Sequence, residues 1–220
     1  MIKKTRLLFL LTAVWLLPMP PAMAEAEHPS STDETLQFLV KPPKRPPHKH
    51  SAHITITNNS LKTGWVLNKQ CHYNLARVPA LEVVFHKGGV RNLRISRADN
   101  IKKAWVEGST VQLVDIGKNA VLCIYSETHT FKFDTLSGTY AWHGGPYMKR
   151  FLDGYFTMHL NLAVDYPYNK LRMLSMDPAA LKSRAVSVDG HIRLDTMFVG
   201  RLDIHLKFRP VDKKSGIGWQ

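Results

Sequence analysis

Alternation of apolar and polar residues at every second position is the feature that most constrains this chain. The longest such run covers residues 155–166, where the even positions are apolar or aromatic and the odd positions are mostly polar. A period of two places alternate side chains on opposite faces of an extended strand, so that one face meets a core and the other meets water. The pattern excludes an amphipathic helix for this segment and predicts a β-strand.

Shorter runs of the same kind recur across residues 52–210, separated by Gly, Asn, Asp and Pro. Glycine-containing turns at 87–89, 117–119 and 199–201 predict three hairpins between consecutive runs. Helix signals are few, and the clearest is a capped turn at 177–182. We therefore predict an all-β fold, a single antiparallel β-sandwich or barrel-like domain with about ten strands and one or two short helical turns.

The first 24 residues have the organisation of a secretory signal peptide. Lys3, Lys4 and Arg6 precede an apolar run at 7–17, and a small-x-small cleavage signal ends at Ala24. A membrane-spanning helix needs about 20 apolar residues, more than this run provides. We therefore expect a periplasmic or secreted protein without a transmembrane span. The expected organisation is a signal peptide at 1–24, a flexible leader rich in Pro, His and basic residues at 25–51, the β domain at 52–210 and a flexible tail at 211–220.

The charge of the chain is strongly basic, with 30 Lys and Arg against 17 Asp and Glu, or +13. Three of these bases lie in the predicted signal peptide, so the mature chain keeps 27 against 17, or +10. A basic protein favours anionic partners. Because export separates the protein from the DNA and RNA of its own cell, we expect an anionic glycan, a lipid or an acidic protein, and no nucleic acid.

The chain has only two cysteines, Cys71 and Cys123. In an exported protein a single pair usually forms a disulfide. Catalytic use is the alternative, but the pair lacks C-x-x-C spacing. We therefore predict a structural disulfide between Cys71 and Cys123.

Sequence motifs of catalysis are absent. The chain has no G-x-S-x-G, S-x-x-K or H-E-x-x-H, and no G-x-G-x-x-G or P-loop. Its acidic residues are scattered, so spacing identifies no general acid and base. We expect a non-enzymatic binding or accessory module and assign no catalytic residue. A cell-wall hydrolase and a structural partner that pairs through a sheet edge remain alternatives.

The densest basic run, at 87–105, is the first candidate binding surface. Arginine can hold phosphate, sulfate or carboxylate through two parallel hydrogen bonds, and Trp can stack on a sugar ring. Strict alternation separates Arg94 from Arg91 and Arg97, so the three converge only if the strand bulges or ends early. An edge strand whose charges prevent aggregation is the alternative. The candidate residues are Arg91, Arg94, Arg97, Lys102, Lys103 and Trp105.

Two further clusters are candidates. An aromatic group beside two glycines and a proline predicts a loop, which either forms a binding platform or closes one end of the sandwich. Its residues are Tyr140, Trp142, His143 and Tyr147. The leader carries His48, His50 and His53, which either chelate Zn or Cu or simply belong to a solvated linker. The sequence implies no other cofactor.

Overall fold

The computed structural model describes residues 30–31, 35–152 and 154–211. The predicted signal peptide and all of the predicted tail except Val211 lie outside the described residues. Within the described part, no helix is long and apolar enough to cross a membrane.

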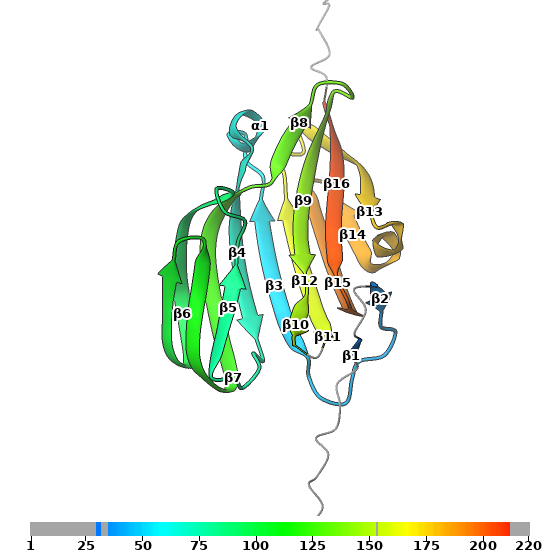
Figure 1. Ribbon diagram of the computed structural model, residues 1–220. Coiled ribbons are helices and arrows are strands. Elements are labelled where there is room, and N and C mark those ends of the chain that lie inside the picture. The colour runs from blue at the N-terminus through cyan, green and yellow to red at the C-terminus, as the bar shows by residue number, and fades with distance from the viewer. Residues whose placement is uncertain (1–29, 32–34, 153, 212–220) are drawn as a thin grey trace, which may run out of the picture.

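The largest sheet contains nine strands in the order β14–β15–β12–β3–β4–β7–β5, with β2 beside β15 and β6 beside β7 (Figure 1). Its strands are β2 (Gln37–Phe38), β3 (His48–Thr55), β4 (Trp65–Tyr73), β5 (Ala80–Val84), β6 (Val90–Glu107), β7 (Thr110–His129), β12 (Met158–Asp165), β14 (Ala185–Val188) and β15 (His191–Val199).

A second sheet, in the order β13–β16–β9–β8, packs on part of this large sheet, and a small third sheet has the order β1–β11–β10. These strands are β8 (Phe131–Asp134), β9 (Thr139–Tyr147), β13 (Leu171–Asp177), β16 (Leu202–Pro210), β1 (Ser30–Ser31), β10 (Lys149–Phe151) and β11 (Gly154–Phe156). The helices in the described residues are α1 (Ser60–Thr63) and the 3₁₀ helix η1 (Ala179–Arg184). The all-β, sandwich-like prediction is confirmed, and none of the sheets closes into a barrel.

The pairing of strands differs from the predicted hairpins. β5 pairs with β7 instead of β6, and the runs at 110–116 and 120–126 form one continuous strand, β7. β15 and β16 belong to different sheets, so their apolar faces meet across the sandwich instead of lying side by side. β3 and β12 are parallel, whereas the other strand pairs in the described residues are antiparallel. These pairings depend on the burial of each apolar face against the opposite layer. The residues of a local turn do not indicate how the layers pack.

Part of the predicted flexible leader belongs to the fold. β2 pairs with β15 through Phe38 and Phe198, and the Phe38 side chain packs against the core. β3 begins at His48, four positions before the predicted start of the domain at residue 52. The sheet gains these residues because their backbone groups complete the hydrogen-bond ladders of β12 and β15.

The apolar core consists of two separate clusters. The first lies between the large sheet and the β13–β16–β9–β8 sheet, and we call the region around it the sandwich lobe. The second lies inside the curl formed by β5, β6 and β7, which we call the hairpin lobe. Figure 1 shows the hairpin lobe projecting to one side of the sandwich. Every described strand outside β5, β6 and β7 belongs to the sandwich lobe or to the small third sheet.

Irregular positions bend the β6–β7 hairpin into this curl. The β6 register shifts between Arg91 and Arg94, between Ile95 and Arg97, and once more after Asp99. Asn92 is one of several Asn and Asp residues in the hairpin with positive φ, a conformation that these residue types tolerate better than most. Each bulge adds a residue to one strand and increases its local twist.

Gly144 in β9 allows the indole of Trp142 to lie against the backbone. A Cβ atom at Gly144 would be 2.1 Å from Cη2 of Trp142, a side chain only 1% exposed. We expect Gly144→Ala to lower the free energy of unfolding by about 1–3 kcal/mol through overpacking. Urea denaturation measures this loss. Gly89→Ala is the control, because a Cβ there meets mainly the exposed side chain of His86. Equal losses in the two variants would contradict the assigned role of Gly144.

Candidate functional site

The bulges of β6 place the three predicted arginines on one face. Arg91, Arg94 and Arg97 lie opposite alternate residues of β7, which are Glu127, Tyr125 and Cys123. Alternate residues of a strand share a face, and the intervening residue Ile124 points into the core of the hairpin lobe. The arginines therefore lie together on the outer face of the large sheet. The bulges that this convergence requires are present in β6.

Lys69 of β4 joins this group, because it lies opposite Tyr125. The Lys69 ammonium and the Arg94 guanidinium lie 5.4 and 5.1 Å from the centre of the Tyr125 ring. Neither cation forms an ion pair within the described residues. We call Lys69, Arg91, Arg94 and Arg97, with the rings of Trp65 and Tyr125, the basic face.

The other two arginines of the basic face have acidic neighbours. Arg91 forms an ion pair with Glu127 at 2.6 Å and lies 4.3 Å from the centre of the Trp65 ring. The hydrogen bond from Arg91 lowers the pKa of Glu127. Arg97 forms an ion pair with Asp99. An incoming anion therefore meets two cations without carboxylate partners, Lys69 and Arg94. The other two, Arg91 and Arg97, must release a carboxylate before they bind the anion.

The remaining predicted residues lie elsewhere on the hairpin. Lys102, Lys103 and Trp105 belong to the half of β6 that pairs with the segment of β7 next to β5. Lys102 forms an ion pair with Asp115 at 3.0 Å, and the Lys103 ammonium lies 4.7 Å from the Trp105 ring. The structure divides the predicted surface in two, and only the first half gathers several arginines.

The predicted aromatic loop is a strand. Tyr140, Trp142, His143 and Tyr147 all belong to β9. Trp142 and Tyr147 are buried, and Tyr140 stacks on Phe131 at the margin of the core. His143 alone points outward, where it stacks on His205 and contacts Asp203. The correction has a simple cause, because alternation along β9 directs most of these rings into the sandwich.

The three predicted metal-binding histidines do not gather on one face. His48 and His50 point inward from β3, whereas the exposed His53 contacts the Asp165 carboxylate at 2.5 Å. Positions 48 and 50 share a face of a strand, and position 53 lies on the opposite face. Within the described residues, no group of three or more His, Cys, Asp or Glu side chains could hold a metal ion as it stands.

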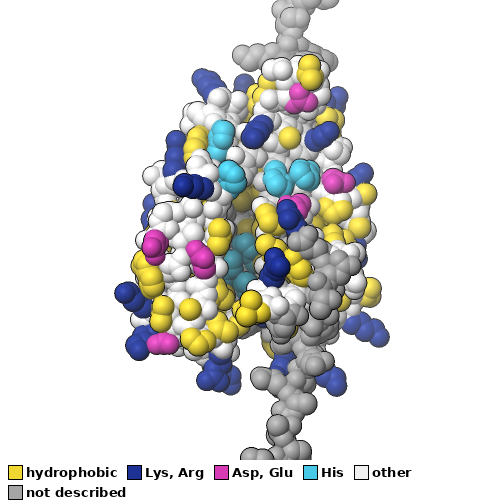
Figure 2. Space-filling model, in the orientation of Figure 1, with side chains coloured by type: hydrophobic (Ala, Val, Ile, Leu, Met, Phe, Trp, Pro, Cys, Tyr) yellow, Lys and Arg dark blue, Asp and Glu magenta, His cyan; other side chains and the backbone are white. Residues whose placement is uncertain are grey.

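A group of inward-facing polar side chains separates the two apolar clusters, and sequence reasoning did not find it. We call this group the polar seam. It consists of His48 and His50 of β3, Asn68, Gln70 and His72 of β4, and Ser126 of β7. Figure 2 shows a hollow between the two lobes with histidine side chains at its floor, where β3 and β4 lie side by side.

Hydrogen bonds connect four members of the polar seam in a chain, in which each residue donates to the next. The Asn68 amide donates to Oε1 of Gln70 at 3.3 Å, and Nε2 of Gln70 lies 3.3 Å from Nε2 of His72. Nδ1 of His72 lies 3.0 Å from Nε2 of His48. Because an amide nitrogen only donates, His72 accepts from Gln70 at Nε2 and donates to His48 from Nδ1. This assignment follows from the network of neighbouring groups.

Burial keeps these imidazoles neutral. It lowers the pKa of His48 to about 3 and that of His50 to about 4, and it lowers the pKa of His72 well below its ordinary value. Burial also raises the pKa of Tyr147, whose ring lies 5.3 Å from the His50 ring. Three buried atoms of the seam have no hydrogen-bond partner among the described residues, namely Nε2 of His50, Oδ1 of Asn68 and Oγ of Ser126.

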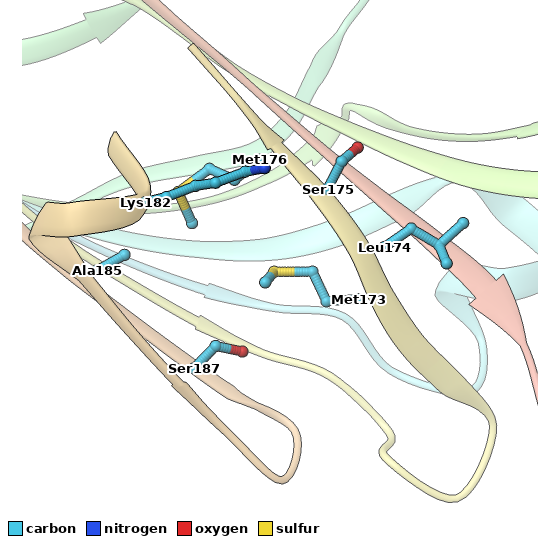
Figure 3. A pocket seen from close by; sticks show the side chains of 7 residues that line it. All are labelled: Met173, Leu174, Ser175, Met176, Lys182, Ala185 and Ser187. Atoms are coloured by element: carbon cyan, nitrogen blue, oxygen red, sulfur yellow. The ribbon is translucent and has the colours of Figure 1, made fainter. Parts of the chain in front are cut away.

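A small pocket lies apart from both groups, between β13, η1 and β14 (Figure 3). Its lining residues are Met173, Leu174, Ser175, Met176, Lys182, Ala185 and Ser187. Lys182 is the only ionisable group in this lining, so the pocket offers no pair of groups for acid–base chemistry.

Cys71 and Cys123 form the predicted disulfide. They lie directly opposite each other on β4 and β7, on the outer face beside Arg97. Comparisons of the chain with protein families, with curated proteins and with solved structures find no match.

Proposed function

We propose that the protein is exported to the periplasm or secreted and binds an anionic glycan through the basic face, as a non-enzymatic binding or accessory module. The observation that carries the proposal is the placement of Arg91, Arg94 and Arg97 on one outer face by the bulges of β6. The disulfide supports export, because disulfides persist mainly in oxidising compartments.

A glycan suits the basic face better than a lipid or an acidic protein. Arg94 and Lys69 provide charge-assisted hydrogen bonds for a sulfate or carboxylate group. The rings of Trp65 and Tyr125 lie against these cations, and such rings provide the flat apolar surface on which sugars pack. Leu67 is the exposed aliphatic side chain of this region, too little apolar surface for insertion into a membrane.

Heparin, a sulfated glycan, is a suitable probe. We expect Arg94→Ala combined with Lys69→Ala to weaken heparin binding about tenfold or more, because each charge-assisted hydrogen bond contributes about 1.5–3 kcal/mol and about 1.4 kcal/mol corresponds to a factor of ten. Fluorescence titration at several salt concentrations measures the affinity. Binding of the wild-type protein should weaken as salt rises.

The matched control is Lys132→Ala combined with Lys207→Ala. These exposed lysines belong to β8 and β16, the two neighbours of β9, and lie on the outer face of the second sheet. Their removal changes the net charge by the same amount as the removal of Arg94 and Lys69. Equal weakening in both double variants would show that net charge alone attracts heparin, and would contradict the basic face. Stronger binding to phosphatidylglycerol vesicles or to polyglutamate than to heparin would contradict the choice of a glycan.

A further inference from the structure

The polar seam contains an arrangement that suits a metal ion of low charge. Neutral imidazole is the form of histidine that ligates metals, and the ring centres of His48 and His72 lie 5.2 Å apart in the polar seam. His50 is only 6% exposed, and its Nε2 atom has no hydrogen-bond partner among the described residues. The rings of His50 and His72 are 4.3 Å apart between centres. Several imidazole nitrogen atoms that can ligate a metal therefore lie close together at the floor of the hollow.

The hydrogen-bond chain of the seam can also run in the opposite direction. If the amide groups of Gln70 and Asn68 both rotate by half a turn, their oxygen and nitrogen atoms exchange places. Oε1 of Gln70 then accepts from Nε2 of His72, and the amide of Gln70 donates to Oδ1 of Asn68, while Nδ2 of Asn68 takes the position that has no partner. The single proton of neutral His72 moves from Nδ1 to Nε2, and no proton is gained or lost.

This reversal leaves two lone pairs close together when neutral His48 carries its proton on Nδ1. Nδ1 of His72 and Nε2 of His48, 3.0 Å apart, are then both acceptors. A cation between them removes the repulsion, and the hydrogen bond from His72 to Gln70 then supports the ligand as outer-shell partners usually do. The reversed chain thus frees two nitrogen atoms for a cation and keeps both hydrogen bonds of the Gln70 amide.

The surroundings favour Cu⁺ over Zn²⁺. Zn²⁺ in structural sites takes four ligands in a tetrahedral arrangement, and no such group stands ready in the described part of the chain. Met158 of β12 lies directly opposite His48 in the register and points to the same inward face. Its thioether is a soft ligand that selects Cu⁺, and the methionine side chain is flexible. The positive charge of Lys149, which acts on His48, favours the ion of lower charge.

We propose that His48, His72 and Met158 bind one Cu⁺ ion in the polar seam, with His50 beside them and Gln70 as the positioning residue of His72. This site is independent of the basic face, which lies on the opposite side of the same sheet. Loss of copper binding therefore leaves heparin binding unchanged, and the two proposals succeed or fail separately.

The experiment is a titration of the purified chain with Cu⁺ in competition with bicinchoninate, under ascorbate, which keeps copper reduced and leaves the disulfide intact. We expect one equivalent of Cu⁺ to bind, with nitrogen and sulfur neighbours in the X-ray absorption spectrum. His72→Gln and Met158→Leu should each weaken Cu⁺ binding about tenfold or more, as loss of a metal-site group does. Met158→Leu should also remove the sulfur signal.

His53→Gln is the matched control, because His53 lies on the opposite face of β3. Circular dichroism establishes that each variant is folded, and Met158→Leu, which conserves volume in the core, decides the question if His72→Gln does not fold. The proposal is overturned if the wild-type protein binds no Cu⁺, if the sulfur signal persists in Met158→Leu, or if His53→Gln weakens binding as much as the seam variants.

Discussion

Acidification from pH 7 to pH 4 is expected to unfold the metal-free protein. The cause is the group of buried imidazoles in the polar seam, whose pKa values lie far below the ordinary value of 6.5. In the unfolded chain these histidines take up protons below about pH 6.5. In the folded protein burial lowers the pKa of His50 to about 4, that of His48 to about 3, and that of His72 well below its ordinary value. The unfolded state then binds more protons, so the free energy of unfolding falls as the pH falls.

The size of this effect is large compared with the stability of a typical domain. Each histidine that is protonated only in the unfolded state costs about 1.4 kcal/mol per pH unit. With His48, His50 and His72 together, the loss between pH 6 and pH 5 reaches about 4 kcal/mol, against a total stability of about 5–15 kcal/mol. Carboxylates such as Glu127, whose pKa is lowered by Arg91, titrate below this window.

Urea denaturation at pH 7, 6 and 5 measures the prediction directly. His72→Gln removes one of the three titrating groups and should reduce the pH dependence by about 1.4 kcal/mol per unit. His205→Gln is the control, because His205 is exposed on the outside of the second sheet. A stability that is constant from pH 7 to pH 5 would show that these imidazoles are protonated in the folded protein.

Removal of the disulfide is expected to lower the free energy of unfolding by about 4 kcal/mol. Cys71 and Cys123 are 52 positions apart in the sequence, and the chain-entropy argument assigns about this value to a loop of such length. The bond joins β4 to β7, so it fastens the hairpin lobe to the sandwich lobe on the outer face of the sheet, opposite the polar seam. The variant is Cys71→Ala combined with Cys123→Ala.

Urea denaturation of this double variant and of the reduced wild-type protein gives two independent measurements. Both should show the same loss, because both remove the same covalent link between β4 and β7. The iodoacetamide-treated, oxidised wild-type protein is the control and should keep its stability, since the described residues include no free cysteine. A loss below about 1 kcal/mol would indicate that the link constrains the unfolded chain little.

The strands could be predicted from the sequence because alternation is a local property. The run at 155–166 contains β12, although its first residues belong to β11 in another sheet, and the presence of just two cysteines in a chain expected to be exported predicted their bond correctly. The partner of each strand could not be predicted in the same way. β15 and β16 have equivalent apolar faces whether they pair or oppose each other, and only the packing of the two layers distinguishes these arrangements.

The candidate sites were harder to predict for two different reasons. The convergence of Arg94 with Arg91 and Arg97 depends on bulges, which change the parity of a strand without a clear sequence signal. The polar seam depends on Asn68 and His72 pointing inward, although polar residues usually mark the solvent face. Local patterns therefore found the basic residues, but of the polar seam they found only His48 and His50, which were assigned to a flexible leader.

The position of β4 gives the junction between the two lobes a stability that depends on temperature differently from that of the apolar cores. β4 pairs with β3 on one side and with β7 on the other, while its inward side chains from Asn68 to His72 belong to the polar seam. Once the disulfide is removed, separation of the lobes along this line exposes mainly the polar side chains of the seam, so it carries a smaller change in heat capacity than global unfolding. Cooling weakens the two apolar cores and leaves the junction between them largely unaffected.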